Sequence, residues 1–150
     1  MSNFSFDSDD RSYVVYEEDG NRLFEKVNEY FRKYALSKNA VEYTIPSMID
    51  RSVLEKCGYM SSFPQHLTSA AYIDSSDFGK VSNDNKCTVD NMKISDKFFT
   101  PAACLHIYPC LSGKKIKNDI ITTLANVFRS ETKEYNASTR LWNFHVRELI

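Results

Sequence analysis

The stretch FRSETKEYNASTRLWNFHVREL, residues 128–149, combines arginines, glutamates and large aromatic rings within twenty-two positions. It continues a β-branched, apolar segment, 121–127, and divides into two strand-like halves around a polar loop, 132–139. Alternate side chains of a strand share a face, so Arg129 should point the same way as Val127, and Trp142 the same way as Phe144. The stretch therefore predicts an antiparallel hairpin.

The predicted register of this hairpin places Glu131 opposite Arg140 and Arg129 opposite Trp142. One face then presents two arginines, two carboxylates and two rings, whereas a slip of one residue would distribute them over both faces. Arginine binds phosphates through forked hydrogen bonds, and a ring such as Phe144 can stack on a base. The pattern is thus compatible with a nucleotide site, but spacing alone favours a solvated sheet face that carries cross-strand ion pairs.

The rest of the chain predicts an α+β fold with a mixed, mainly antiparallel sheet flanked by helices. A stripe of period 3.6 predicts a helix over 21–36. The other predicted elements are a strand over 40–46, a short helix over 47–59, a strand from 68, a loop over 75–91, a buried strand or extended segment over 102–108, and the strands of the hairpin.

Composition limits the classes of function. The 150 residues carry a net charge of -1, from 19 Lys and Arg against 20 Asp and Glu, so there is no basic excess to hold a long nucleic acid. Hydrophobic residues make up 42%, enough for one folded domain, and no apolar run approaches a membrane span. The first residues, 1–12, are acidic and polar and are expected to be disordered. A soluble cytoplasmic protein is expected.

Four cysteines, Cys57, Cys87, Cys104 and Cys110, have spacings that match no zinc finger and no small disulfide framework. Free thiols in a reducing compartment are the simplest interpretation. A cysteine within an apolar run, as Cys104 is, more often packs in a core than binds a ligand.

The hairpin resembles motif 2 of class II aminoacyl-tRNA synthetases. That motif is a Phe-Arg-x-Glu strand, a variable loop, and an Arg or His followed by Phe, here 128–131 and 140–144. Segment 23–46 resembles motif 1, a long helix and a strand ending in Pro46, which builds the dimer interface in that family. Segments 43–64, 100–109 and 145–149 resemble the seryl-tRNA synthetase group and its zinc-containing branch, which includes amino acid:[carrier protein] ligases. The resemblance covers residues 13–150.

The resemblance implies a role for each motif 2 residue. Arg129 would be catalytic, holding the α-phosphate of ATP and the carboxylate of the amino acid while charge develops. Glu131 would accept a hydrogen bond from the adenine amino group, Arg140 would bind the γ-phosphate, and Phe144 would stack on adenine. The implied cofactors are ATP with Mg²⁺.

The zinc-containing branch also implies a metal site. Its members ligate Zn²⁺ through a cysteine before motif 2, matched by Cys104, and a glutamate seventeen residues after the motif 2 glutamate, matched by Glu148. The substrate amino group would take the open position on the metal. The family's third ligand, a cysteine far downstream of motif 2, has no counterpart in the chain.

The implied activity is ATP-dependent activation of a small amino acid, followed by transfer to the phosphopantetheine arm of a carrier protein. The balance of charge and the short segment before the motif 1 helix argue against tRNA as a partner. Motif 3 is missing, so residues 1–150 resemble a partial catalytic domain, a truncated or split half that is not active alone. The expected assembly is a homodimer through the motif 1 helix or a complex with a complementing C-terminal half. The alternatives are a non-catalytic nucleotide-binding or dimerisation module and a decayed fragment.

Overall fold

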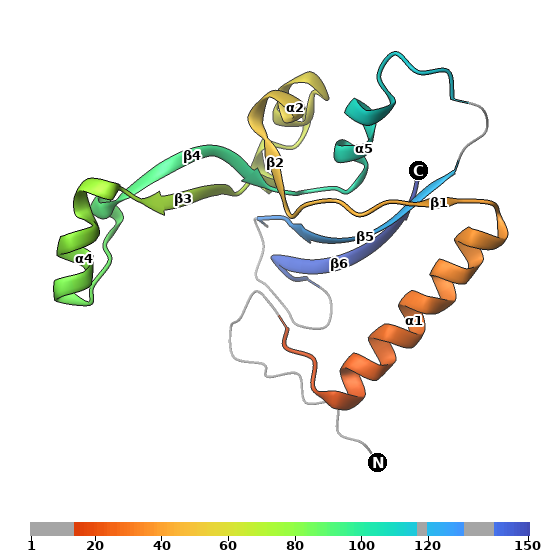
Figure 1. Ribbon diagram of the computed structural model, residues 1–150, viewed down its shortest axis with the longest axis horizontal. Coiled ribbons are helices and arrows are strands. Elements are labelled where there is room, and N and C mark those ends of the chain that lie inside the picture. The colour runs from red at the N-terminus through yellow and green to blue at the C-terminus, as the bar shows by residue number, and fades with distance from the viewer. Residues whose placement is uncertain (1–13, 117–119, 131–139) are drawn as a thin grey trace.

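A computed structural model describes residues 14–116, 120–130 and 140–150, and its fold is the α+β architecture that the sequence predicts (Figure 1). Two three-stranded sheets have the orders β1-β5-β6 and β2-β4-β3, and every strand pair except β1 with β5 is antiparallel. Helix α1 lies on one side of β5 and β6, and α5 lies on the other (Figure 1). The predicted disordered segment, 1–12, lies outside the described residues.

The first sheet positions the hairpin. Its strands are β1 (Val41–Glu42), β5 (Ile121–Phe128) and β6 (Asn143–Leu149). β5 is the central strand, and most of its side chains are buried on both faces, which explains its β-branched, apolar sequence. The strand predicted over 40–46 is confirmed only as β1, near its start, where it pairs in parallel with β5.

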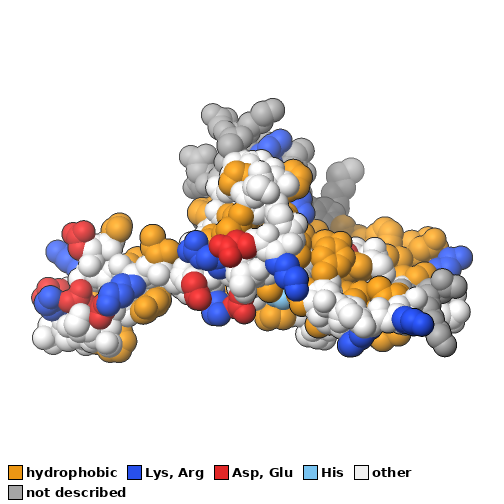
Figure 2. Space-filling view, turned by 90° about the horizontal axis from the view of Figure 1, so that it is seen from above, with side chains coloured by type: hydrophobic (Ala, Val, Ile, Leu, Met, Phe, Trp, Pro, Cys, Tyr) orange, Lys and Arg blue, Asp and Glu red, His pale blue; other side chains and the backbone are white. Residues whose placement is uncertain are grey.

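The second sheet extends into a projecting arm. Its strands are β2 (Met48–Asp50), β3 (Ser69–Ile73) and β4 (Met92–Phe99), and α4 (Phe78–Asp84) lies at the far end of the β3–β4 ribbon (Figure 1). Seen from above, the arm carries charges of both signs interspersed with apolar side chains (Figure 2). Short 3-10 helices cover Pro64–His66, Ser75–Asp77 and Val89–Asn91.

Helix α1 (Glu18–Ser37) confirms the first predicted helix, but most of its apolar stripe does not face the sheet. The side toward β6 carries Phe24, which contacts the ring of His145, together with the polar Asn28 and Arg32. His145 thus lies on the opposite face from Phe144, as alternation along a strand requires. Six large apolar side chains of α1 are exposed, and five of them follow the helical stripe: Leu23, Val27, Tyr30, Phe31 and Tyr34.

Three short helices close the other side of the molecule. They are α2 (Arg51–Lys56), α3 (Tyr59–Ser62) and α5 (Cys104–Leu111). One buried cluster joins α2, α5 and the second sheet through Leu54, Leu105 and Phe98. A second cluster, Ala103 with Ala125 and Val127, packs the start of α5 against β5, with Phe144 against it from β6. The hairpin is therefore anchored by its apolar members.

Three predicted elements require correction, and a fourth element, β4, was not predicted. Segment 102–108 is not a strand, because α5 begins at Cys104 and continues past Pro109. Residues 48–50 of the predicted helix form β2, and the predicted loop 75–91 contains α4. Strand β4 is absent from the predicted elements. Both β2 and β4 are defined by pairing with distant strands, which local periodicity does not reveal.

Within the described ranges, no helix has the length and apolar character needed to cross a membrane.

Candidate functional site

The hairpin has the predicted register. Val127 pairs with Phe144 and Thr123 with Glu148, which is the alignment that sets Arg129 opposite Trp142. The Arg129 N–H donates to the carbonyl oxygen of Trp142 at 2.8 Å. Because cross-strand partners share a face, Arg129, Phe144 and Glu148 lie on the face that meets α5. The pairing of Glu131 with Arg140 remains a prediction, since Glu131 lies outside the described residues.

Arg129 stands where β5 leaves the sheet. Its Nε donates to the Pro101 carbonyl oxygen at 2.9 Å, and its guanidinium carbon lies 5.6 Å from the centroid of the Phe144 ring. A cation over an aromatic face is favourable, and more so where water is partly excluded, as at the half-buried Arg129. A phosphate-binding group and an aromatic surface therefore lie within reach of one nucleotide.

Two further residues of the hairpin lie within the described ranges. Arg140 is half-buried at the start of the returning chain, and Trp142 donates from its indole N–H to the Thr68 hydroxyl at 2.9 Å. Trp142 thus links the hairpin to the segment that leads into β3 rather than presenting a free ring. The roles of Glu131 and Arg140 toward ATP stay predictions.

The turn 100–104, which joins β4 to α5, was not predicted as part of the site. Thr100 is fully buried; its N–H donates to the Ser47 carbonyl oxygen at 3.0 Å and its own carbonyl oxygen accepts from the Phe128 N–H at 2.9 Å. Its hydroxyl lies 2.8 Å from Nε2 of His106, and burial lowers the pKa of that imidazole. The turn is thus fixed from three sides. Its signal in the sequence was Pro101, because proline fixes φ and is typical of turns.

Cys104 and Glu148, the two predicted zinc ligands, do come together. Glu148 Oε1 accepts from the Ala103 N–H at 3.1 Å, and Oε2 accepts from the Cys104 N–H at 3.0 Å. Burial raises the pKa of the Cys104 thiol, and the nearby Glu148 charge raises it further. Cys104 itself stands at the first turn of α5, not on a strand as predicted.

These two residues do not by themselves fit a zinc ion. Both carboxylate oxygens already accept backbone hydrogen bonds. Among the residues that the structure describes, no group of three His, Cys, Asp or Glu side chains could hold a metal ion. A zinc site would need a third ligand from elsewhere.

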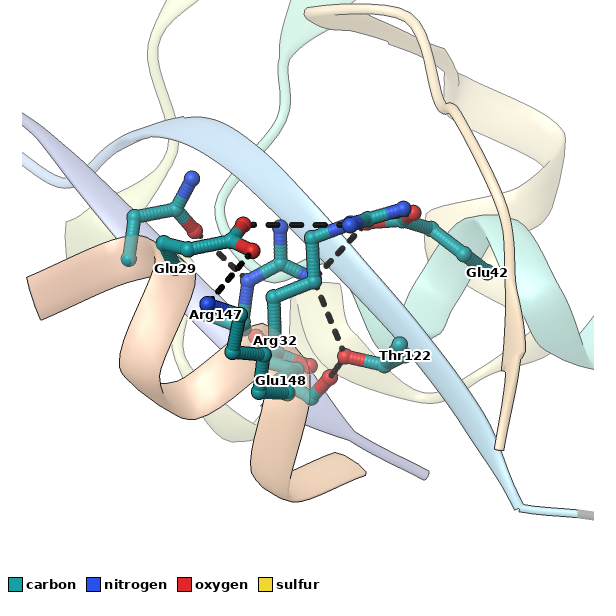
Figure 3. A network of polar contacts seen from close by, with 8 residues as sticks. Glu29, Arg32, Glu42, Thr122, Arg147 and Glu148 are labelled. Carbon is teal, nitrogen blue, oxygen red and sulfur yellow. Dashed lines mark hydrogen bonds and ion pairs between the residues drawn. The ribbon is translucent and has the colours of Figure 1, made fainter. Parts of the chain in front are cut away.

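The opposite face of the hairpin carries a polar network that the sequence did not suggest (Figure 3). Arg147 is 6% exposed; its Nε donates to Asn28 Oδ1 at 2.6 Å and its Nη1 donates to Glu42 Oε1 at 3.1 Å. Arg32 of α1 donates to the other Glu42 oxygen at 2.8 Å. The hydrogen bond from Arg32, and to a smaller extent that from Arg147, holds the pKa of the Glu42 carboxyl below its usual value. The network fixes α1 to β1 and β6.

Searches for related proteins show what the chain resembles. No family model and no curated protein matches the sequence. Among solved structures, the neighbours of this fold are class II aminoacyl-tRNA synthetases, the class whose motif 2 the hairpin resembles.

Three solved synthetase structures superpose on most of this chain. Seryl-tRNA synthetase of M. kandleri, in complex with tRNASec of A. aeolicus, superposes with a TM-score of 0.77 at 14% identity, covering 93% of this chain and 30% of its own. Prolyl-tRNA synthetase of Giardia lamblia, in complex with prolyl-adenylate, gives 0.68 at 16% identity, with 93% and 26% covered. The RNA binding domain of threonyl-tRNA synthetase from Cryptosporidium parvum Iowa II gives 0.62 at 10% identity, with 91% and 30% covered.

At these identities the likeness is one of fold, and the chain spans less than a third of each neighbour's length. One neighbour holds a tRNA in its crystal structure, and another is described as an RNA binding domain. The argument from charge against tRNA as a partner is therefore contradicted, because proteins of this fold bind tRNA. No solved structure among the three is a carrier-protein ligase.

Proposed function

We propose that the face of β5 and β6 that carries Arg129 and Phe144 binds ATP and takes part in the activation of a small amino acid. The observation that carries this proposal is the placement of the Arg129 guanidinium over the Phe144 ring, in the hairpin register that the sequence predicts. The likeness to a synthetase solved with an aminoacyl-adenylate supports the same chemistry.

In the proposed reaction, a carboxylate oxygen of the amino acid attacks the α-phosphorus of ATP, and pyrophosphate leaves to give an aminoacyl-adenylate. Arg129 would neutralise charge on the α-phosphate as the new bond forms, and Phe144 would hold the adenine ring. Mg²⁺, when bound, would supply positive charge that offsets the charge of the phosphates. The proposed reaction includes no zinc-dependent step, because the described residues do not complete a zinc site.

The acceptor proposed for the activated amino acid is the phosphopantetheine thiol of a carrier protein, which would attack the adenylate carbonyl and release AMP. The support for this acceptor is the sequence likeness of segments 100–109 and 145–149 to carrier-protein ligases. A charging assay with carrier protein and tRNA side by side tests it, and transfer to tRNA alone would overturn it.

The chain is proposed to need a partner for this activity. Five of the exposed apolar side chains of α1, from Leu23 to Tyr34, form a stripe of helical period, and the two-residue β1 leaves the first sheet short at that edge. A second copy docked on α1, or a polypeptide that completes the sheet, would cover them. The alternative function, favoured by the same stripe, is a non-catalytic nucleotide-binding or dimerisation module.

Amino-acid-dependent exchange of labelled pyrophosphate into ATP tests the proposed activation, with the chain alone and with added candidate partners. Exchange that requires glycine or alanine and disappears in Arg129→Ala would support the enzyme. ATP binding without exchange in any combination would support the module, and no ATP binding at all would contradict both.

A further inference from the structure

We propose that Glu148 is a positioning residue that fixes the turn 101–104 and, through that turn, the guanidinium of Arg129. This role differs from the metal-ligand role that the sequence predicts for Glu148. Its relevance to nucleotide binding rests on the proposed function, whereas its geometry does not.

The contact between Glu148 and α5 is the first step. The first N–H groups of a helix have no partner within the helix, and here those of Ala103 and Cys104 donate to the two oxygens of one carboxylate. Ala103 is fully buried, so its N–H has little access to water as a substitute. A negative charge at this end is also favoured by the helix dipole. Glu148 therefore caps α5 from β6.

The turn transmits this constraint to Arg129. Pro101 lies two residues before Ala103, and its carbonyl oxygen accepts from Arg129 Nε at 2.9 Å. Thr100, just before it, is fixed on its other side by backbone hydrogen bonds to Ser47 and Phe128. A turn held at both ends leaves the Pro101 carbonyl little freedom. Removing the Glu148 carboxylate would free the α5 end of the turn. The Pro101 carbonyl oxygen, which accepts from Arg129, would then be free to move.

The two ends of the hairpin thus act on one short segment. Arg129 directly follows β5, and Glu148 lies on β6. Both bind the turn 101–104, which belongs to neither strand. The contact at Nε holds the direction of the guanidinium, which is how an arginine is preorganised for a ligand.

The test is NMR hydrogen exchange in the complete 17.3 kDa chain, measured at the Ala103 and Cys104 amides and at Arg129 Nε–H. Glu148→Gln keeps the size of the side chain but replaces one acceptor by a donor, and Glu148→Ala removes both acceptors. We expect exchange at all three positions to rise about tenfold or more in each variant. Glu42→Gln is the matched control: it weakens the network on the opposite face and should leave these three protons unchanged.

The proposal is overturned if Glu148→Gln frees the two amides but leaves exchange at Arg129 Nε–H unchanged. It is also overturned if the wild-type chain binds one Zn²⁺ in a titration with zinc chloride and Glu148→Gln abolishes that binding. Should Glu148→Ala fail to fold, Glu148→Gln decides both points. A parallel MgATP titration separates this inference from the proposed function, because a chain that shows the exchange pattern but binds no ATP refutes only the proposed function.

Discussion

The two faces of the β5–β6 pair are held by different chemistry. Toward α1 the contacts are polar and centre on Arg147, whereas toward α5 they are apolar and centre on Val127 and Phe144. On the polar face the helix turns its own apolar stripe outward, where another chain could cover it. On the apolar face, packing continues until Arg129, where a cation and a ring meet at the edge of the core. The difference suggests that one face serves assembly and the other binds a ligand.

The largest expected effect comes from breaking the polar face. Arg147→Met leaves Glu42 and Asn28 without their buried donor and should lower the free energy of unfolding by about 2–3 kcal/mol. Arg32→Met is the control, because Arg32 is 39% exposed and should cost about 0.5 kcal/mol. Urea unfolding measures both. Equal losses in the two variants would show that burial of Arg147 adds nothing.

A cavity on the apolar face should have a slightly smaller effect. Val127 is fully buried between Ala103, Ala125 and Phe144, so Val127→Ala removes two methyl groups and should cost about 2 kcal/mol. Val89 is 84% exposed, and Val89→Ala should change the free energy of unfolding little. If the two valine variants unfold at the same urea concentration, the second cluster is not a core.

The exposed stripe of α1 gives the next prediction. If it is an assembly surface, Phe31→Asp should weaken self-association about tenfold, because a charge replaces a ring at the interface. Lys33→Asp, a neighbouring change that also adds negative charge, is the control. Sedimentation equilibrium over a range of concentrations measures both. A wild-type chain that stays monomeric throughout would remove the homodimer and leave a complementing chain.

The smallest effect is expected in the arm. A hydrogen bond from Lys93, helped by the N–H and hydroxyl of Ser76, lowers the pKa of Asp74 from 3.8 to about 2. A carboxyl group with a lowered folded-state pKa stabilises the fold above its unfolded value, and that contribution is lost as the pH falls from about 4 to about 2. Amide exchange in β3 and β4 should therefore rise over this range. In Asp74→Asn this pH dependence should be reduced, and an unchanged profile would assign the effect to other groups.

The hairpin could be predicted because its information is local. Alternation over 121–129 and 140–149 set the face of each side chain, and the pairing of Val127 with Phe144 is the predicted one. The placement of Arg129 beside Phe144 followed from that register. The stripe of α1 was equally visible, but periodicity does not say whether a stripe meets the chain's own sheet or another surface.

Helix α5 could not be predicted in this way, because its cap comes from Glu148, 44 residues beyond Cys104. Two prolines and an apolar run made 102–108 look like a buried strand. The Arg147 network was missed for a similar reason: its partners lie on α1, β1 and β5, and nothing near Arg147 in sequence announces them. Contacts between distant elements decide these parts of the fold.

The central claim, that Arg129 and Phe144 form a nucleotide-binding face, is tested most directly by titrating the chain with MgATP and following the fluorescence of Trp142. Trp142 is the single tryptophan of the chain, and its carbonyl oxygen accepts from the Arg129 N–H. We predict a saturable change whose affinity falls about tenfold or more in Arg129→Ala. Arg51→Ala, which removes another arginine that lies over a phenylalanine ring, should bind ATP as the wild type does. No saturable change in the wild-type chain, or equal affinities in all three proteins, would contradict the claim.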